Sequence, residues 1–213
     1  MADVIDYNQL EGTLGTLTPS MVAVFACCCA ERTAGLLNTS TDPVIPALGR
    51  QVLDLSWRAL DRQNEVSPQS QILIDRLLGQ LGEDSNFGPN HSIIFDAILC
   101  VGYAGMSVAA RAGSSKSTLS EAILAARSEI SLIKVSYFER HGTYSGADSH
   151  ESLRRGRSWQ ARDASELEGA RISAAKVDLM RLRARKESVL TLAGVIDGDW
   201  SQTLPDDEWP TLF

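Results

Sequence analysis

The feature that most restricts the fold of this chain is its hydrophobic period, because apolar residues recur every three or four positions in segment after segment. This spacing places them on one face of an α-helix, whereas a half-buried strand would alternate every second residue. No alternating segment of useful length is present. Proline, glycine and Ser/Thr caps mark where helices start and stop. The expected helices start at Thr18-Pro19 and Pro46, or run over Ser67–Gly82, Pro89–Ala112, Thr118–Gly142 and Ser165–Ala193.

These segments predict an all-α fold, a helical bundle of about six or seven helices with a long buried central helix. The central helix is expected in the apolar run Ile93–Ala110. A membrane span is the alternative, but the run is short for a span and contains Asp96. Gly102 and Gly105 would also favour close helix packing, so a buried helix is the preferred interpretation.

Composition divides the chain into four parts. Residues 1–142 are expected to form a helical core domain. Residues 143–158 are rich in Gly, Ser and charged side chains, which predicts a mobile loop. Residues 159–196 are expected to form a C-terminal helix that packs on the core, and residues 197–213 an acidic tail that contains tryptophan.

The charge distribution argues weakly against a dedicated nucleic-acid binder, because the formal net charge of the 213 residues is −7. A dense basic stretch at 154–186 is the exception, and it could contact phosphates, form a solvated helix face or attract the acidic tail. Acidic and aromatic residues in that tail predict either a partner-binding segment or one that folds back onto the domain. The candidate partner-binding residues are Trp200, Asp206, Asp207, Glu208 and Trp209.

Three consecutive cysteines lie in the apolar segment VFACCCAER, residues 24–32. On a helix they diverge by about 100° per residue and cannot converge on one ion, so no metal site is predicted. We expect Cys28 and Cys29 to fill core space and Cys27 to be more peripheral. Arg32 could flank Cys28 and activate it, but this is a thin basis for a nucleophile. No disulfide framework, cofactor motif or secretory signal is recognisable, which favours a cytoplasmic protein.

Two pairs of segments carry a resemblance to a known family. They are FACCCAERTAGLL with LGRQVLDLSWRALD, and FDAILCVGYAG with TLSEAILAARSEISLIKVSYFE. Their order resembles the YjaG-like family of uncharacterised all-helical bacterial proteins over roughly residues 10–140. The matching positions are Cys29, Glu31 and Arg32, then Leu53, Asp54 and Trp57, then Asp96 and Ala97. The resemblance implies an all-α bacterial cytosolic fold and supplies no catalytic residues.

Four charged residues embedded in these apolar helices form a candidate buried charge network: Glu31, Arg32, Asp54 and Asp96. A buried charge is tolerable only when it is paired. We therefore expect Arg32 to pair with Asp54 or Asp96, either as a structural ion pair or as part of a functional pocket.

The resulting functional hypothesis is a non-catalytic, protein-binding helical domain, plausibly a bacterial immunity or antitoxin-type protein that neutralises a partner toxin. No catalytic constellation is recognisable, and an acidic surface suits a basic partner. Two alternatives stay open. One is a nucleic-acid-associated regulator that uses the basic 154–186 segment. The other is an enzyme whose site forms only in the fold, near Arg32, Asp54, Asp96 or a histidine.

Overall fold

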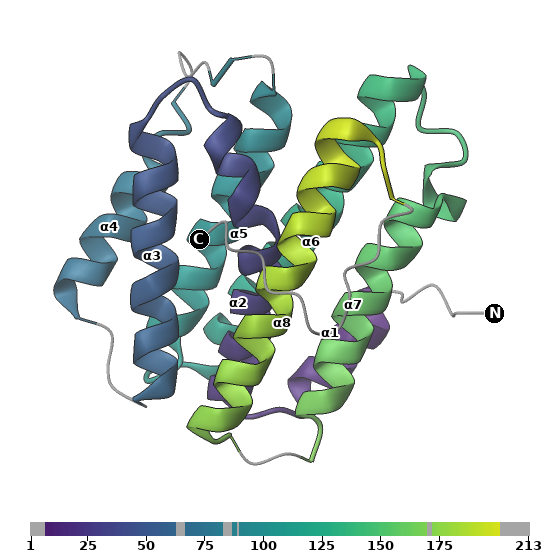
Figure 1. Cartoon of the computed structure of the whole chain (residues 1–213). Coiled ribbons are helices and arrows are strands. Elements are labelled where there is room, and N and C mark those ends of the chain that lie inside the picture. Colours follow the sequence, from purple (N-terminus) through teal and green to yellow (C-terminus); the bar gives the residue numbers. More distant parts are fainter. Residues whose placement is uncertain (1–6, 63–66, 83–86, 89, 170–171, 201–213) are drawn as a thin grey trace.

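The computed structural model describes residues 7–62, 67–82, 87–88, 90–169 and 172–200. Within these ranges the chain forms eight α-helices and no strand, packed as a bundle (Figure 1), which confirms the predicted all-α class. The helices are α1 (Tyr7–Gly15), α2 (Pro19–Ala34), α3 (Val44–Asp61), α4 (Pro68–Leu78), α5 (His91–Ala110), α6 (Ser115–His141), α7 (Glu151–Leu167) and α8 (Ala174–Leu192). The 3₁₀ turns η1 (Gly35–Thr39) and η2 (Ala147–Ser149) and the π-helical turn η3 (Ala193–Asp197) lie between or after them.

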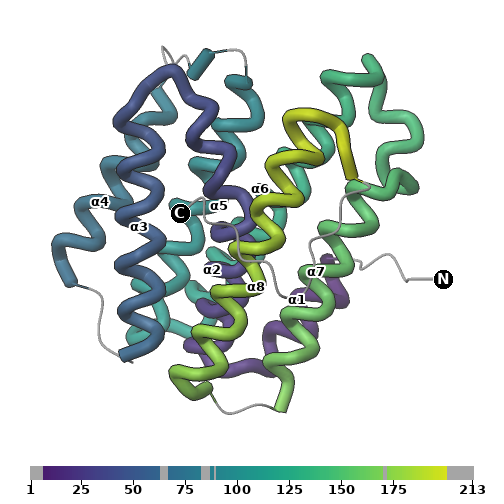
Figure 2. The backbone as a smooth tube through the Cα atoms, viewed as in Figure 1, coloured from purple at the N-terminus to yellow at the C-terminus, as the bar shows by residue number. Residues whose placement is uncertain are grey.

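Helix α2 is the most completely buried element. Every residue from Met21 to Thr33 is buried, and the helix packs against α3, α5, α6, α7 and α8. Figure 2 shows its tube passing behind α8. The expected central helix, α5, contacts α2, α3, α4 and α6 but buries only 11 of its 20 residues. Helix α2 therefore lies at the centre of the bundle. A helix can occupy this position when apolar and small residues cover all of its faces.

Two segments, Pro19–Thr39 and His91–Ala110, are long and apolar enough to cross a membrane. Their most apolar stretches are 89% and 61% buried against other helices of the bundle. Core helices of soluble proteins share this length and composition, so these two properties alone do not place either segment in a membrane.

Several helix ends lie where local chemistry predicts them. The Thr18 hydroxyl accepts a hydrogen bond from the Met21 amide, and Ser67 caps α4 in the same way. Gly142 ends α6 in the left-handed conformation, with φ +67°. The predicted cap at Thr118 is wrong, because Ser114 caps α6 four residues earlier and Thr118 lies within the helix.

The predicted mobile loop at 143–158 is wrong over its second half, since α7 begins at Glu151 with His150 as its N-cap. Gly156 is a packing residue rather than a loop residue, because a Cβ there would lie 2.8 Å from Ile133 of α6. The single expected C-terminal helix is also wrong. It is divided into α7 and α8, with Gly169 at φ +69° after the first and Ser173 capping the second.

Candidate functional site

The interior of the bundle holds an ion-pair cluster centred on Arg32 of α2, whose side chain has no solvent exposure. Its Nε donates to Glu129 Oε1 of α6 at 2.5 Å, and its Nη2 donates to Glu129 Oε2 at 3.1 Å. Its Nη1 donates to Asp163 of α7 at 2.6 Å and to Glu187 of α8 at 3.2 Å. These four residues, which we name the Arg32 cluster, connect four helices through one guanidinium.

Further cations at the edge of the bundle complete the pairing of these carboxylates. Arg162 bridges Asp163 at 2.9 Å and Glu187 at 2.6 Å. Arg183 donates to Asp163 at 2.8 Å. Gln160 donates its amide to Glu129 at 2.9 Å, so every carboxylate of the Arg32 cluster has a hydrogen-bond donor in addition to Arg32. Such saturation is what a buried ionic group requires to be tolerated.

The pKa directions follow from this arrangement. Burial alone would lower the pKa of Arg32, but the charges of Glu129 and Asp163 outweigh it and raise that pKa well above its usual value. Burial opposes ionisation of Asp163, yet Arg32 and Arg162 hold its pKa below the usual range. Burial prevails at Glu187, whose pKa is raised despite Arg32. Glu187 is therefore the carboxylate that the cluster stabilises least.

A second group of ion pairs surrounds the neighbouring residue, Glu31, and we name it the Glu31 cluster. Glu31 accepts from Trp57 Nε1 at 2.6 Å, from Arg50 at 2.9 Å and from Arg185 at 2.8 Å. Asp54 lies in the same cluster, where it accepts from Arg50 and Arg181, each at 2.7 Å. The two consecutive charged residues of α2 thus point in different directions. Glu31 points toward α3 and α8, and Arg32 points toward α6, α7 and α8.

Arg32 is paired inside the bundle as expected, but both of its predicted partners are wrong. The carboxylates that pair with Arg32 come from α6, α7 and α8. Asp54 instead belongs to the Glu31 cluster, where it and Glu31 bind the same arginines. Asp96 is half-buried and interacts with Ser131, and burial raises its pKa. The helical period identifies buried positions, but it does not say which distant helix faces them.

All four cysteines are free and buried, including Cys27, which the sequence placed more peripherally. Burial raises the pKa of all three adjacent thiols above the usual value. Arg32 lies beside Cys29, with Nη2 and Sγ 3.5 Å apart, and its charge also acts on Cys28, but burial outweighs it at both thiols. An activated nucleophile needs a lowered thiol pKa, so these shifts have the wrong direction for that role. No group of three or more His, Cys, Asp or Glu side chains placed to hold a metal ion occurs in the described ranges.

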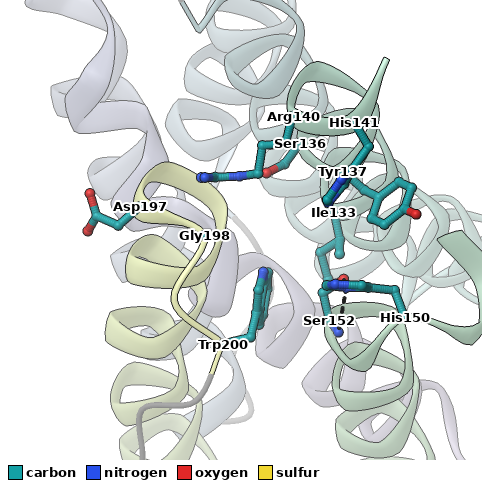
Figure 3. Close-up of a pocket in the computed structure, with 10 residues that line it drawn as sticks. All are labelled: Ile133, Ser136, Tyr137, Arg140, His141, His150, Ser152, Asp197, Gly198 and Trp200. Carbon is teal, nitrogen blue, oxygen red and sulfur yellow. Dashed lines mark hydrogen bonds between the residues drawn. The ribbon is translucent and has the colours of Figure 1, made fainter. Parts of the chain in front are cut away.

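A surface pocket of about 260 Å³ lies where α6 and the start of α7 meet η3, and Figure 3 shows its lining. Tyr137, His141 and His150 form an aromatic group on one side of it. The ring centroids of Tyr137 lie 4.3 Å from His141 and 5.0 Å from His150, and the two histidines are 6.0 Å apart. Trp200 stands on the opposite side of the pocket from His150 (Figure 3).

Sequence reasoning did not find this pocket. Tyr137 and His141 are four residues apart on one helix, a spacing that places both on one face and could have signalled their contact. His150 joins them only because the turns between α6 and α7 reverse the chain.

The predicted partner-binding tail is only partly described. Trp200 is 7% exposed and packs against the backbone of Gly194, where a Cβ would overlap its indole ring. It therefore folds back onto the domain, one of the two alternatives that the sequence left open. Asp206, Asp207, Glu208 and Trp209 lie outside the described residues.

No family model matches this chain, and no similar protein was found among the curated proteins or the solved structures compared with it.

Proposed function

We propose that this chain is a non-catalytic helical protein-binding domain of the bacterial immunity or antitoxin type, which covers a basic partner surface. One observation carries the proposal, namely that carboxylates of the same chain pair with many of its cations. The Arg32 and Glu31 clusters, together with Arg162, Arg183, Glu166 and Lys176, contain seven basic and six acidic side chains, a net +1. The whole chain carries −7, so the residues outside these clusters carry −8.

An acidic exterior favours a partner with a basic face. Complementary charge accelerates encounter and fixes orientation, and it disfavours partners of the same sign. Toxins that act on nucleic acids need basic substrate-binding surfaces, and these are natural targets for an acidic cover. The resemblance to the YjaG-like family is compatible with this proposal but adds no activity to it.

The nucleic-acid alternative loses support from the same ion pairs. Of the ten basic residues in the 154–186 stretch, seven form intramolecular ion pairs. These seven are Arg155, Arg157, Arg162, Lys176, Arg181, Arg183 and Arg185. A cation paired with a carboxylate of the same chain contributes less to phosphate binding, because its charge is already partly neutralised.

The enzyme alternative near Arg32, Asp54 and Asp96 also loses support. Arg32 is fully enclosed and all of its contacts are to residues of its own bundle, so a substrate has no access to it. Asp54 is about one-third exposed but is held by three arginines, which fits a structural role better than proton transfer.

The test is co-expression of this chain with the protein encoded beside it in the genome. We expect rescue of growth if that neighbour is toxic, and a stable complex on size-exclusion chromatography whose affinity falls as salt rises. Failure to rescue, absence of any complex, or salt-independent affinity would contradict the proposal. Binding of DNA or RNA by the free protein at low salt would favour the alternative instead.

Charge-neutralised variants localise the contact. The triple variant Asp206→Asn, Asp207→Asn, Glu208→Gln removes three charges from the tail. A matched control removes three exposed charges elsewhere, at Glu11, Asp61 and Asp75. Weakening by the tail variant alone assigns the partner contact to the tail, and equal weakening by both assigns it to the general acidic field. If neither variant weakens the complex, the electrostatic basis of the proposal is wrong.

A further inference from the structure

The pocket between α6, α7 and η3 is built from residues whose positions the backbone dictates. The π-helical turn leaves the carbonyl of Val195 free of the ordinary helical pattern, and it accepts from Ser136 Oγ at 2.9 Å and from Arg140 Nη2 at 2.8 Å. These two bonds hold the turn against α6. Single π-helical turns occur frequently at functional sites.

Two glycines make room for the side chains that line the pocket. Gly194 lets the Trp200 ring lie against the backbone of η3, and any Cβ there would overlap the ring. Gly198 has φ +77°, and a Cβ at this position would overlap the Arg140 guanidinium. The left-handed conformation also favours glycine over other residues. The indole and the guanidinium therefore occupy their places because the backbone carries no side chains there.

The pocket contains hydrogen-bond donors that the fold leaves unused. Arg140 donates one N–H to the Val195 carbonyl. None of the described carboxylates forms an ion pair with Arg140. The Ser152 amide donates to His150 Nδ1 at 3.3 Å, so in the neutral imidazole the proton resides on Nε2. No described residue accepts from that Nε2–H. Figure 3 shows this imidazole extending toward the side of the pocket where Trp200 stands.

Among the lining residues that the structure describes, Asp197 is the only carboxylate, and Figure 3 shows it directed away from the histidine rings, beyond η3. The Ser152 hydroxyl is 2.7 Å from His150 Nδ1 and is therefore already engaged. The free polar groups of the pocket thus include the N–H donors of Arg140 and His150, the first of them a permanent cation, and an indole ring forms one wall.

We infer that this pocket binds a small organic oxyanion, a phosphate or carboxylate group attached to a planar ring. The oxyanion would accept from Arg140 and His150, since charge-assisted bonds from guanidinium to such groups are the strongest that side chains offer. The ring would lie against Trp200. The volume, about 260 Å³, is just below the range of drug-sized sites, which limits the ligand to a small molecule. This inference does not depend on the proposed partner.

Calorimetric titration of the full chain with four probes tests it: phenyl phosphate, benzoate, inorganic phosphate and benzylamine. We expect phenyl phosphate and benzoate to bind saturably at one site, inorganic phosphate to bind more weakly, and benzylamine not to bind. Equal binding of benzylamine would overturn the oxyanion assignment. Absence of saturable binding by both ring-bearing anions in the millimolar range would overturn the site itself.

Variants separate the pocket from general charge effects. Arg140→Gln and His150→Asn should each weaken phenyl phosphate binding about tenfold or more. Asparagine is chosen at 150 because it preserves an N-cap for α7. Arg154→Gln is the matched control, since it removes the same charge from an exposed position on α7 outside the pocket. Circular dichroism melts confirm that each variant is folded. Equal affinity of all three variants, or equal loss in all three, would contradict the assignment.

Discussion

Replacement of Arg32 by methionine is the most direct perturbation of this fold. Methionine fills a similar volume and removes the only cation that contacts Glu129, Asp163 and Glu187 together. After the change, Asp163 and Glu187 retain Arg162, and Asp163 also retains Arg183. Glu129 retains only neutral side-chain donors, the amide of Gln160 and the thiol of Cys29. The variant thus leaves a carboxylate that is 1% exposed without a cation.

The expected loss is large relative to the stability of a domain. Breaking a buried ion pair by removing one partner costs about 3–5 kcal/mol, because the remaining charge stays desolvated. For a chain of this size each kcal/mol corresponds to about 2–4 °C, so the melting temperature should fall by roughly 6–20 °C. A free energy of unfolding of about 5–15 kcal/mol would be reduced substantially but not abolished in most of that range.

Urea denaturation and thermal melts followed by circular dichroism measure this loss. The matched control is Arg50→Met, because the Arg50 side chain is 31% exposed and its partner Glu31 would keep Arg185 and Trp57. We expect the control to cost clearly less. A double variant, Arg32→Met with Glu129→Gln, should recover part of the lost stability, since it removes the unpaired charge. The reasoning would be refuted by an unchanged midpoint in Arg32→Met, or by a double variant less stable than the single one.

Three further outcomes are expected. Gly194→Ala should displace Trp200, destabilise the fold by about 1–3 kcal/mol and shift tryptophan emission to the red, whereas Gly12→Ala, which meets open space, should not destabilise it. The four buried thiols should react with Ellman's reagent only on unfolding, because burial keeps them protonated, so rapid labelling of the native protein at pH 8 would contradict the structure. Because the pKa of Asp163 is lower in the folded state, its contribution is present above the unfolded value of about 3.9 and is lost as pH falls through the folded value. Asp163→Asn should therefore lose less stability than the wild type between about pH 4 and pH 2, and parallel acid limbs in the two proteins would disprove this assignment.

Local chemistry explains the elements that the sequence predicted well. A serine or threonine before proline caps α2 and α4, and a left-handed glycine ends α6, because these signals act over three or four residues. Local composition gave a wrong prediction where a residue contacts a segment that is distant in the sequence. Gly156 resembles a loop residue but permits α7 to approach α6, and the arginines around it resemble a solvated face although several turn toward internal carboxylates.

The sequence alone determined that the chain is helical, that it has no alternating strands, and that Arg32 must find a carboxylate. The tertiary structure alone decided which carboxylates those are, because Glu129, Asp163 and Glu187 lie 97, 131 and 155 residues away along the chain. It likewise decided that α2 occupies the centre and that His150 joins Tyr137 and His141. Periodicity specifies which face of a helix is buried. Which helix packs against that face depends on how the eight described helices pack together in the bundle.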